Sequence, residues 1–224
     1  MPFSLVSSGG KVLGASGGNS NPLNTLTAKL IVVHLAGGVS GGAGVGTLAD
    51  SKSNLWIPLS SHLDTIICSR FWFCINPIVD ANHVFTTSGA GQYSTICIQA
   101  WKTAGKVVLD SQSGSQINAT SITLPSIFSS SYKELFITGL VARDSFASAS
   151  VNGGFSITNS FPGTGGLTWG GAMAYLMALG AAAQSPTWIA SGNVSCAASM
   201  VAFKETLPFI PKASIRVGPW TTPK

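Results

Sequence analysis

The chain has 224 residues, of which 45% are hydrophobic and only 8% are charged, whereas an ordinary soluble domain carries roughly 25% charged residues. The net charge of +5 arises mainly because there are just seven acidic residues. The basic residues are scattered, so the composition argues against nucleic acid as a partner. A surface this poor in charge must be built from small polar residues or be covered by neighbouring subunits, which fits a secreted or assembled protein better than a free cytosolic enzyme.

Short runs rich in β-branched and aromatic residues predict strands along the first half of the chain. The continuous apolar centre of residues 26–35 predicts a strand that is buried on both faces. Residues 46–59 contain two apolar stretches around the turn-forming segment Asp50-Ser-Lys-Ser-Asn54, and this pattern predicts a β-hairpin. In the aromatic run at 68–75, alternation places Trp72 opposite to Phe71 and Phe73. Further strands are expected at 3–6, 83–87 and 93–101.

The second half continues the same pattern, with expected strands at 134–142, 155–158, 188–190 and 195–203. Residues 172–179 contain the helix formers Ala, Met and Leu, but the glycines that bracket them favour a strand, with a helix as the alternative. The apolar stretch 172–183 is too short to span a membrane, so no membrane association is expected.

Strands that recur about every ten residues indicate a sandwich and not βαβ units. The sequence therefore predicts an all-β, antiparallel β-sandwich of the jelly-roll kind. We expect one domain over residues 1–205, followed by an extended, Pro-rich tail over 206–224.

Four cysteines, Cys68, Cys74, Cys97 and Cys196, occur without a C-x-x-C pair or a histidine at metal-binding spacing. Free buried thiols are the simpler interpretation. A cross-strand disulfide from Cys68 or Cys74 to one of the other two is the alternative. The separation of Cys68 and Cys74 is even, so the two share a face if they lie on one strand.

Catalytic patterns are weak. The segment Gly38-Val-Ser-Gly-Gly42 matches the G-x-S-x-G nucleophile elbow, but the Gly-rich residues after it cannot begin the helix that the elbow requires. Glu134, Asp144 and Glu205 are candidate carboxylates for glycoside hydrolysis, yet no short motif pairs them. Ser61, His62 and Asp64 are adjacent only in sequence, which says little about a triad. The sequence predicts no enzymatic activity.

Cofactor and metal sites are not expected either. Asp50–Asn54 partly resembles a calcium loop, but Lys52 occupies a position where a ligand oxygen is needed, so a plain turn is favoured. His34 lies in an apolar strand and is interpreted as a core residue. Two tryptophans are better placed for a ligand or partner surface, because Trp169 follows a Gly-rich turn and Trp220 lies in the tail.

Five short segments, in this order, resemble a loose group of bacterial and phage-encoded β-sandwich proteins of uncertain function. The segments are Leu30-Ile-Val-Val33, Asp50-Ser-Lys-Ser-Asn-Leu-Trp56, Arg70-Phe-Trp-Phe73, Pro186-Thr-Trp188 and Ala202-Phe-Lys204. Ser53 and Leu55 stand where that group has Gly and Thr. The resemblance implies a virion-associated or extracellular sandwich, and it implies no catalytic residues.

Taken together, these patterns predict a non-catalytic structural or binding protein of a virion, such as a phage capsid decoration or a tail or fibre component. Its expected partners are further copies of itself and other virion proteins. The alternative is a secreted or surface module that binds carbohydrate or mediates adhesion, with a host surface glycan as its partner. Either function places the protein in a virion or outside the cell.

Overall fold

The computed structural model describes residues 3–14, 16–38, 46–63, 67–88, 94–117, 119–129, 134–143, 147–163, 169–191 and 195–206. These residues form nineteen β-strands and no helix, and the strands pair antiparallel. The prediction of an all-β, antiparallel sandwich is confirmed. No helix in the described ranges is long and apolar enough to cross a membrane.

The first half of the chain forms one long and one short sheet. The long sheet has the order β1-β9-β3-β7-β5, with β6 also paired to β7, and the short sheet has the order β2-β8-β4. The strands are β1 (Ser4–Val12), β2 (Gly17–Asn19), β3 (Leu30–Gly38), β4 (Thr47–Asp50), β5 (Ile57–Pro58), β6 (His62–Leu63), β7 (Ile67–Ile75), β8 (Phe85–Ser88) and β9 (Thr95–Lys102).

The second half forms a long sheet of order β10-β19-β13-β16-β15, a short sheet of order β11-β18-β14, and a two-stranded ribbon β12-β17. The strands are β10 (Lys106–Ile117), β11 (Ser121–Thr123), β12 (Ile127–Phe128), β13 (Glu134–Ala142), β14 (Ala149–Val151), β15 (Ser156–Phe161), β16 (Gly170–Ala178), β17 (Ala183–Gln184), β18 (Thr187–Ala190) and β19 (Cys196–Thr206).

The two halves repeat one topology. In each half the first strand pairs with the last in the long sheet, and the second strand pairs with the last but one in the short sheet, which is the winding of a jelly roll. The registers also correspond, since Leu30 lies opposite Trp101 in the first half and Leu135 lies opposite Phe203 in the second. The chain therefore contains two successive units with the same strand arrangement. That residues 1–205 fold as a single domain stays a prediction, and residues 207–224 of the expected tail lie outside the described residues.

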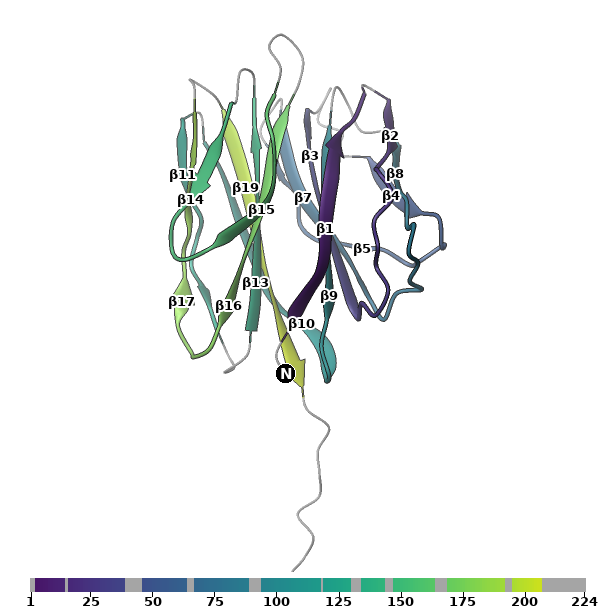
Figure 1. Cartoon of the computed structure of the whole chain (residues 1–224). Coiled ribbons are helices and arrows are strands. Elements are labelled where there is room, and N and C mark those ends of the chain that lie inside the picture. The colour runs from purple at the N-terminus through teal and green to yellow at the C-terminus, as the bar shows by residue number, and fades with distance from the viewer. Residues whose placement is uncertain are drawn as a thin grey trace, which may run out of the picture.

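The sheets stack as four layers, with the two long sheets in the middle and the short sheets outside (Figure 1). One apolar core lies inside each half, and a third lies between the long sheets and draws on both halves. Strand β3 supplies two of these cores by alternation: Leu30 and Val32 face the other half, whereas Ile31 and Val33 face the interior of their own half. Its predicted burial on both faces is confirmed.

Several local expectations are also confirmed. Phe71 and Phe73 face the core between the halves and Trp72 faces the opposite way. Residues 170–178 form a strand, not a helix. The four cysteines form no disulfide and are all buried, and Cys68 and Cys74 share one core.

The predicted hairpin at 46–59 is wrong. Its first strand, β4, pairs with β8 in the short sheet, and its second, β5, pairs with β7 in the long sheet. The segment is a corner that crosses from one layer to the other. The sequence identifies the turn residues correctly, but the two strands beside the turn do not pair with each other: β4 pairs with β8 and β5 pairs with β7.

Candidate functional site

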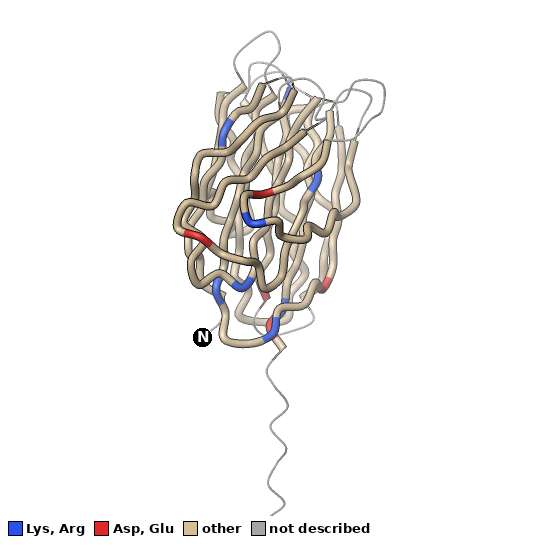
Figure 2. The backbone as a smooth tube through the Cα atoms, turned by 90° about the vertical axis from the view of Figure 1, so that its right-hand side faces the viewer, with Lys and Arg blue, Asp and Glu red and all other residues tan. Residues whose placement is uncertain are grey.

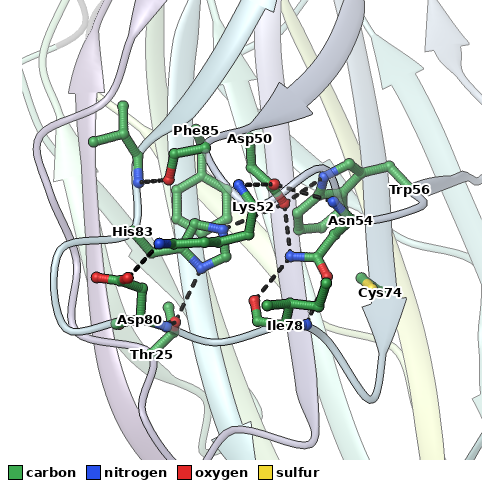
Figure 3. Close-up of polar contacts among 12 residues, drawn as sticks. Thr25, Asp50, Lys52, Asn54, Trp56, Cys74, Ile78, Asp80, His83 and Phe85 are labelled. Atoms are coloured by element: carbon green, nitrogen blue, oxygen red, sulfur yellow. Dashed lines mark hydrogen bonds and ion pairs between the residues drawn. The ribbon is translucent and has the colours of Figure 1, made fainter.

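Asp50 organises this corner (Figure 3). Its Oδ1 accepts hydrogen bonds from the backbone N–H groups of Lys52 (2.8 Å) and Asn54 (3.1 Å), and its Oδ2 accepts from Asn54 Nδ2 (2.9 Å) and Trp56 Nε1 (3.0 Å). Burial by itself raises the pKa of Asp50, but the hydrogen bonds from Asn54 and Lys52 outweigh it and hold the pKa below its ordinary value. The carboxylate therefore stays ionised, and its oxygens are occupied by N–H donors and not free to bind calcium.

Asn54 joins the corner to a second loop. Its Oδ1 accepts from the backbone N–H of Ile78 (2.7 Å) and its Nδ2 donates to the carbonyl of the same residue (3.0 Å). Ser53, just before it, has a φ of 57°, in the left-handed region that favours glycine. Trp56 then packs edge-on against Phe85, with the ring centroids 5.8 Å apart. Residues 50–56 thus hold the β4–β5 corner against the β7–β8 connection, and they place Trp56 against Phe85.

Thr25, His83 and Asp50 lie in the order of a catalytic triad. His83 Nδ1 is 3.0 Å from Thr25 Oγ1, and His83 Nε2 is 3.3 Å from Asp50 Oδ2. However, Thr25 and His83 are completely buried, and Thr25 Oγ1 also hydrogen-bonds the backbone of Asp80. A nucleophile must reach its substrate, so this group cannot act as one.

The cluster has a structural role instead. Desolvation lowers the pKa of His83 despite the opposing effect of Asp50, so the imidazole is neutral at pH 7. His83 Nδ1 hydrogen-bonds Thr25 Oγ1, whereas Nε2 faces the Asp50 carboxylate at 3.3 Å without forming a hydrogen bond. The cluster ties together the β2–β3 connection, β4 and the β7–β8 connection.

The second half does not repeat this polar cluster. The backbone bond between Leu23 and His83 recurs between Leu124 and Pro186, so Pro186 occupies the place of His83. In the first half, Asp50 lies opposite the buried Phe85 of β8. The corresponding pair in the second half is Val151 and the buried Trp188 of β18, so an apolar residue takes the place of Asp50. The fold therefore does not require these polar residues.

A second buried polar group lies between the two halves. His34 Nε2 is 2.8 Å from Ser69 Oγ, which is 2.7 Å from Ser199 Oγ on β19. His34 Nδ1 has no hydrogen-bond partner. Burial lowers the pKa of His34 to about 3, so the imidazole is neutral, and its ring packs against Gly139 of β13. The interpretation of His34 as a core residue is confirmed.

The structure does not assemble the candidate carboxylates into a pair. Glu134 is buried and accepts a hydrogen bond from Ser129 Oγ at 2.6 Å. It lies opposite Lys204, and Glu205, the next residue, points to the other face of the sheet. Asp144 lies outside the described residues.

Ser61 and His62 lie next to each other where β6 begins. His62 is half-buried and its ring packs against Gly114. Asp64 lies outside the described residues, as does the serine of the Gly38-Val-Ser-Gly-Gly42 segment. Among the described residues, no three His, Cys, Asp or Glu side chains come together as a metal site.

Trp169 is not a surface residue, so this part of the prediction is wrong. It is 8% exposed and belongs to a small core with Ala36, Val141 and Ala197. Its indole covers Gly38, where a Cβ would lie 2.5 Å from Nε1, and the Arg143 guanidinium lies 5.8 Å from its ring centroid. A glycine far away in the sequence provides the space for this ring. Trp220 lies outside the described residues.

Six of the ten large apolar side chains that the described residues expose lie in two groups, called rims here, that sequence reasoning missed. The first-half rim comprises Leu26, Leu55, Ile57 and Ile78, and the second-half rim comprises Phe128, Leu179, Ala182 and Ala183. Leu55 is 84% exposed and Ile78 62%, and the Asn54–Ile78 bonds bring them together. Leu179 is 76% exposed and Phe128 66%, and Phe128 pairs with Ala183 across β12 and β17.

The two rims occupy corresponding places in the repeat. Leu26 follows β2 as Phe128 follows β11, and Ile78 follows β7 as Leu179 follows β16. Both rims lie near the end of the stack where β3 and β13 begin and β9 and β19 finish, the lower end in Figure 1. Charged residues are few on the described backbone, and several of them gather toward one end, the lower one in Figure 2. The same part of each half therefore presents apolar surface to solvent.

Comparisons with known proteins gave no match: no family model, no curated protein and no solved structure is similar to this chain.

Proposed function

We propose that this protein is a non-catalytic structural subunit that works by assembling with further copies and other proteins, in a virion or another extracellular particle. The two apolar rims are the observation that carries the proposal. Large apolar side chains exposed at matching places of the two halves form paired surfaces, and contiguous apolar surface marks protein interaction sites.

Burial of the rim side chains supplies part of the free energy of association. Complete burial of a Leu, Ile or Phe side chain contributes about 1.5–3 kcal/mol, and each rim includes at least two such side chains that are more than half exposed. These gains must exceed the entropy lost on association. An assembly that buries both rims of each subunit gains more free energy from apolar burial than one that buries a single rim, and so offsets this entropy better.

The polar chemistry of the described residues is used internally. The Thr25–His83–Asp50 cluster and the His34–Ser69 pair are buried and hold connections or halves together. This supports a role that depends on shape and surface.

The carbohydrate-binding alternative is less well supported. Sugar recognition commonly uses exposed aromatic faces, and the five tryptophans in the described ranges are all 8% exposed or less. Phe128 is the aromatic side chain that the described part of the chain exposes most, and it lies in an apolar rim.

Sedimentation velocity of the full chain tests the proposal. We expect a species larger than the 22.9 kDa chain and a shift toward the monomer when both rims are made polar by Leu55→Ser, Ile78→Ser, Phe128→Ser and Leu179→Ser. The matched control is Ile117→Ser with Ile157→Ser, which removes exposed apolar side chains outside the rims. A strict monomer at the highest soluble concentration, or assembly unaffected by the rim substitutions, contradicts the proposal.

A further inference from the structure

The last described residue of the chain lies close to the second-half rim. In the long sheet of that half, β13 lies between β19 and β16. Glu134 of β13 lies opposite Lys204 of β19 on one side and Ala178 of β16 on the other. Two strand spacings are about 10 Å. Thr206, where β19 finishes, is therefore near Leu179, which follows Ala178.

The remaining sequence has the chemistry to cover an apolar rim. Beyond Thr206 come 18 residues (224 − 206), which can reach about 56 Å at roughly 3.1 Å per residue in an extended polyproline conformation. They include Leu207, Phe209, Ile210, Val217 and Trp220 and no acidic residue. Four prolines restrict the backbone, which lowers the entropy that is lost when such a segment binds.

The prolines also indicate whose rim is covered. Pro208 restricts Leu207 to extended backbone, and Pro211 does the same to Ile210. The segment is thus biased to continue the direction of β19, away from a rim that lies only about 10 Å to the side. Returning Phe209 to its own rim would need a reversal at Leu207–Pro208, which this restriction opposes.

We propose that the C-terminal segment Leu207–Trp220 of one copy binds the second-half rim of a neighbouring copy. Phe209 and Ile210 are its first apolar anchors, in contact with Phe128 and Leu179. Because the segment leaves each copy beside the rim that receives it, two copies that face each other by this end exchange segments through one self-complementary contact. The inference rests on the proposed function and identifies the occupant of one of its two surfaces.

Hydrogen–deuterium exchange of the full chain, read by mass spectrometry, tests this inference. In the parent we expect the amides of 207–220 to exchange at least about tenfold more slowly than unstructured backbone, and to lose this protection on dilution. Phe128→Ser with Leu179→Ser should abolish the protection. The first-half pair Leu55→Ser with Ile78→Ser is the matched control and should retain it. Unchanged exchange in β13 and β19 verifies that each variant is folded.

Three outcomes overturn the inference: unprotected amides in 207–220 at every concentration, protection that persists in the Phe128 and Leu179 variant, or protection that does not change with dilution, which indicates that the segment binds its own chain. The proposed function fails separately. If sedimentation shows an assembly but the amides of 207–220 are unprotected, the assembly stands and only the assignment of this segment to the second-half rim is wrong. A strict monomer overturns the assembly itself.

Discussion

Gly139 is the position where the packing of the two halves can be tested most directly. A Cβ at this position would lie 2.5 Å from His34 Cγ, 2.6 Å from Cδ2 and 2.7 Å from Cε1, so the added methyl would collide with the face of the imidazole. The ring has little freedom to move, because Ser69 holds Nε2 and the Phe71 ring lies 4.9 Å away. Gly139→Ala must therefore push the long sheets apart or distort β3.

Overpacking of this kind costs about 1–3 kcal/mol. For a chain of this size, each kcal/mol lowers Tm by roughly 2–4 °C, so we expect Gly139→Ala to lower Tm by about 2–12 °C. Urea unfolding followed by circular dichroism gives the change in the free energy of unfolding. The matched control is Gly180→Ala, where a Cβ meets nothing within 4 Å and the free energy should scarcely change.

A double-mutant cycle identifies the cause. His34→Ala leaves a cavity and a buried hydroxyl without its partner, and it too is destabilising. In the double variant His34→Ala with Gly139→Ala, the new methyl enters the space of the lost ring, so the combined loss should fall short of the sum by about 1–2 kcal/mol. Additive losses, or a Gly139→Ala variant as stable as the Gly180→Ala control, would refute this account of the interface.

Three further predictions concern polar residues of the Asp50 corner and of the contact between the halves. Asp50→Asn places an amide donor among N–H groups that need an acceptor and should lower the free energy of unfolding in urea by about 3 kcal/mol, whereas Asp80→Asn, at an exposed ion pair with Lys52, should change it far less; equal losses would contradict the central role of Asp50. Ser53→Gly relieves a left-handed backbone and should stabilise the protein by about 0.5 kcal/mol, the strain of an L residue minus the greater chain entropy of glycine; a loss of stability would be the contrary result. The pKa of His34 is depressed from 6.5 to about 3, so its contribution to stability is complete above pH 6.5 and is lost as the pH falls toward 3. By pH 4.5 the loss should reach about 2–3 kcal/mol, and urea titrations of His34→Gln should show a flatter pH dependence over this window, whereas parallel curves would exclude His34 as its source.

The class of fold follows from sequence because alternation and turn residues are local signals. The repeated topology does not, because the halves share strand register more than residue identity. The clearest trace is the agreement of Ile98-Gln-Ala-Trp-Lys102 with Met200-Val-Ala-Phe-Lys204, at the final strand of each half. Two matches in five residues are too few to identify a repeat without the strand pairing. The repeat is also hard to see in the sequence because corresponding positions differ in chemistry, as with His83 in the first half and Pro186 in the second.

The other errors have a common physical origin. The turn at Asp50–Asn54 was identified from residues that bond their own backbone, but the pairing of the strands on either side depends on β7 and β8, which lie later in the chain. The burial of Trp169 depends on Gly38, which lies far earlier in the sequence. The two rims are likewise set by tertiary structure, because composition does not distinguish an exposed Leu179 from a half-buried Leu176 that packs against the core.

The repeated topology changes what the scarcity of charge means. A sheet packed on both faces has no outward side to carry ions, and two of the four layers are sheets of this kind. Much of the apolar content therefore serves contacts within one chain and does not by itself require other subunits. The apolar side chains that those internal contacts leave exposed include the two rims, with Leu55 and Leu179 largely in solvent. The proposed assembly thus depends on a few side chains at one end of the stack and not on composition, and substitution of those side chains is its decisive test.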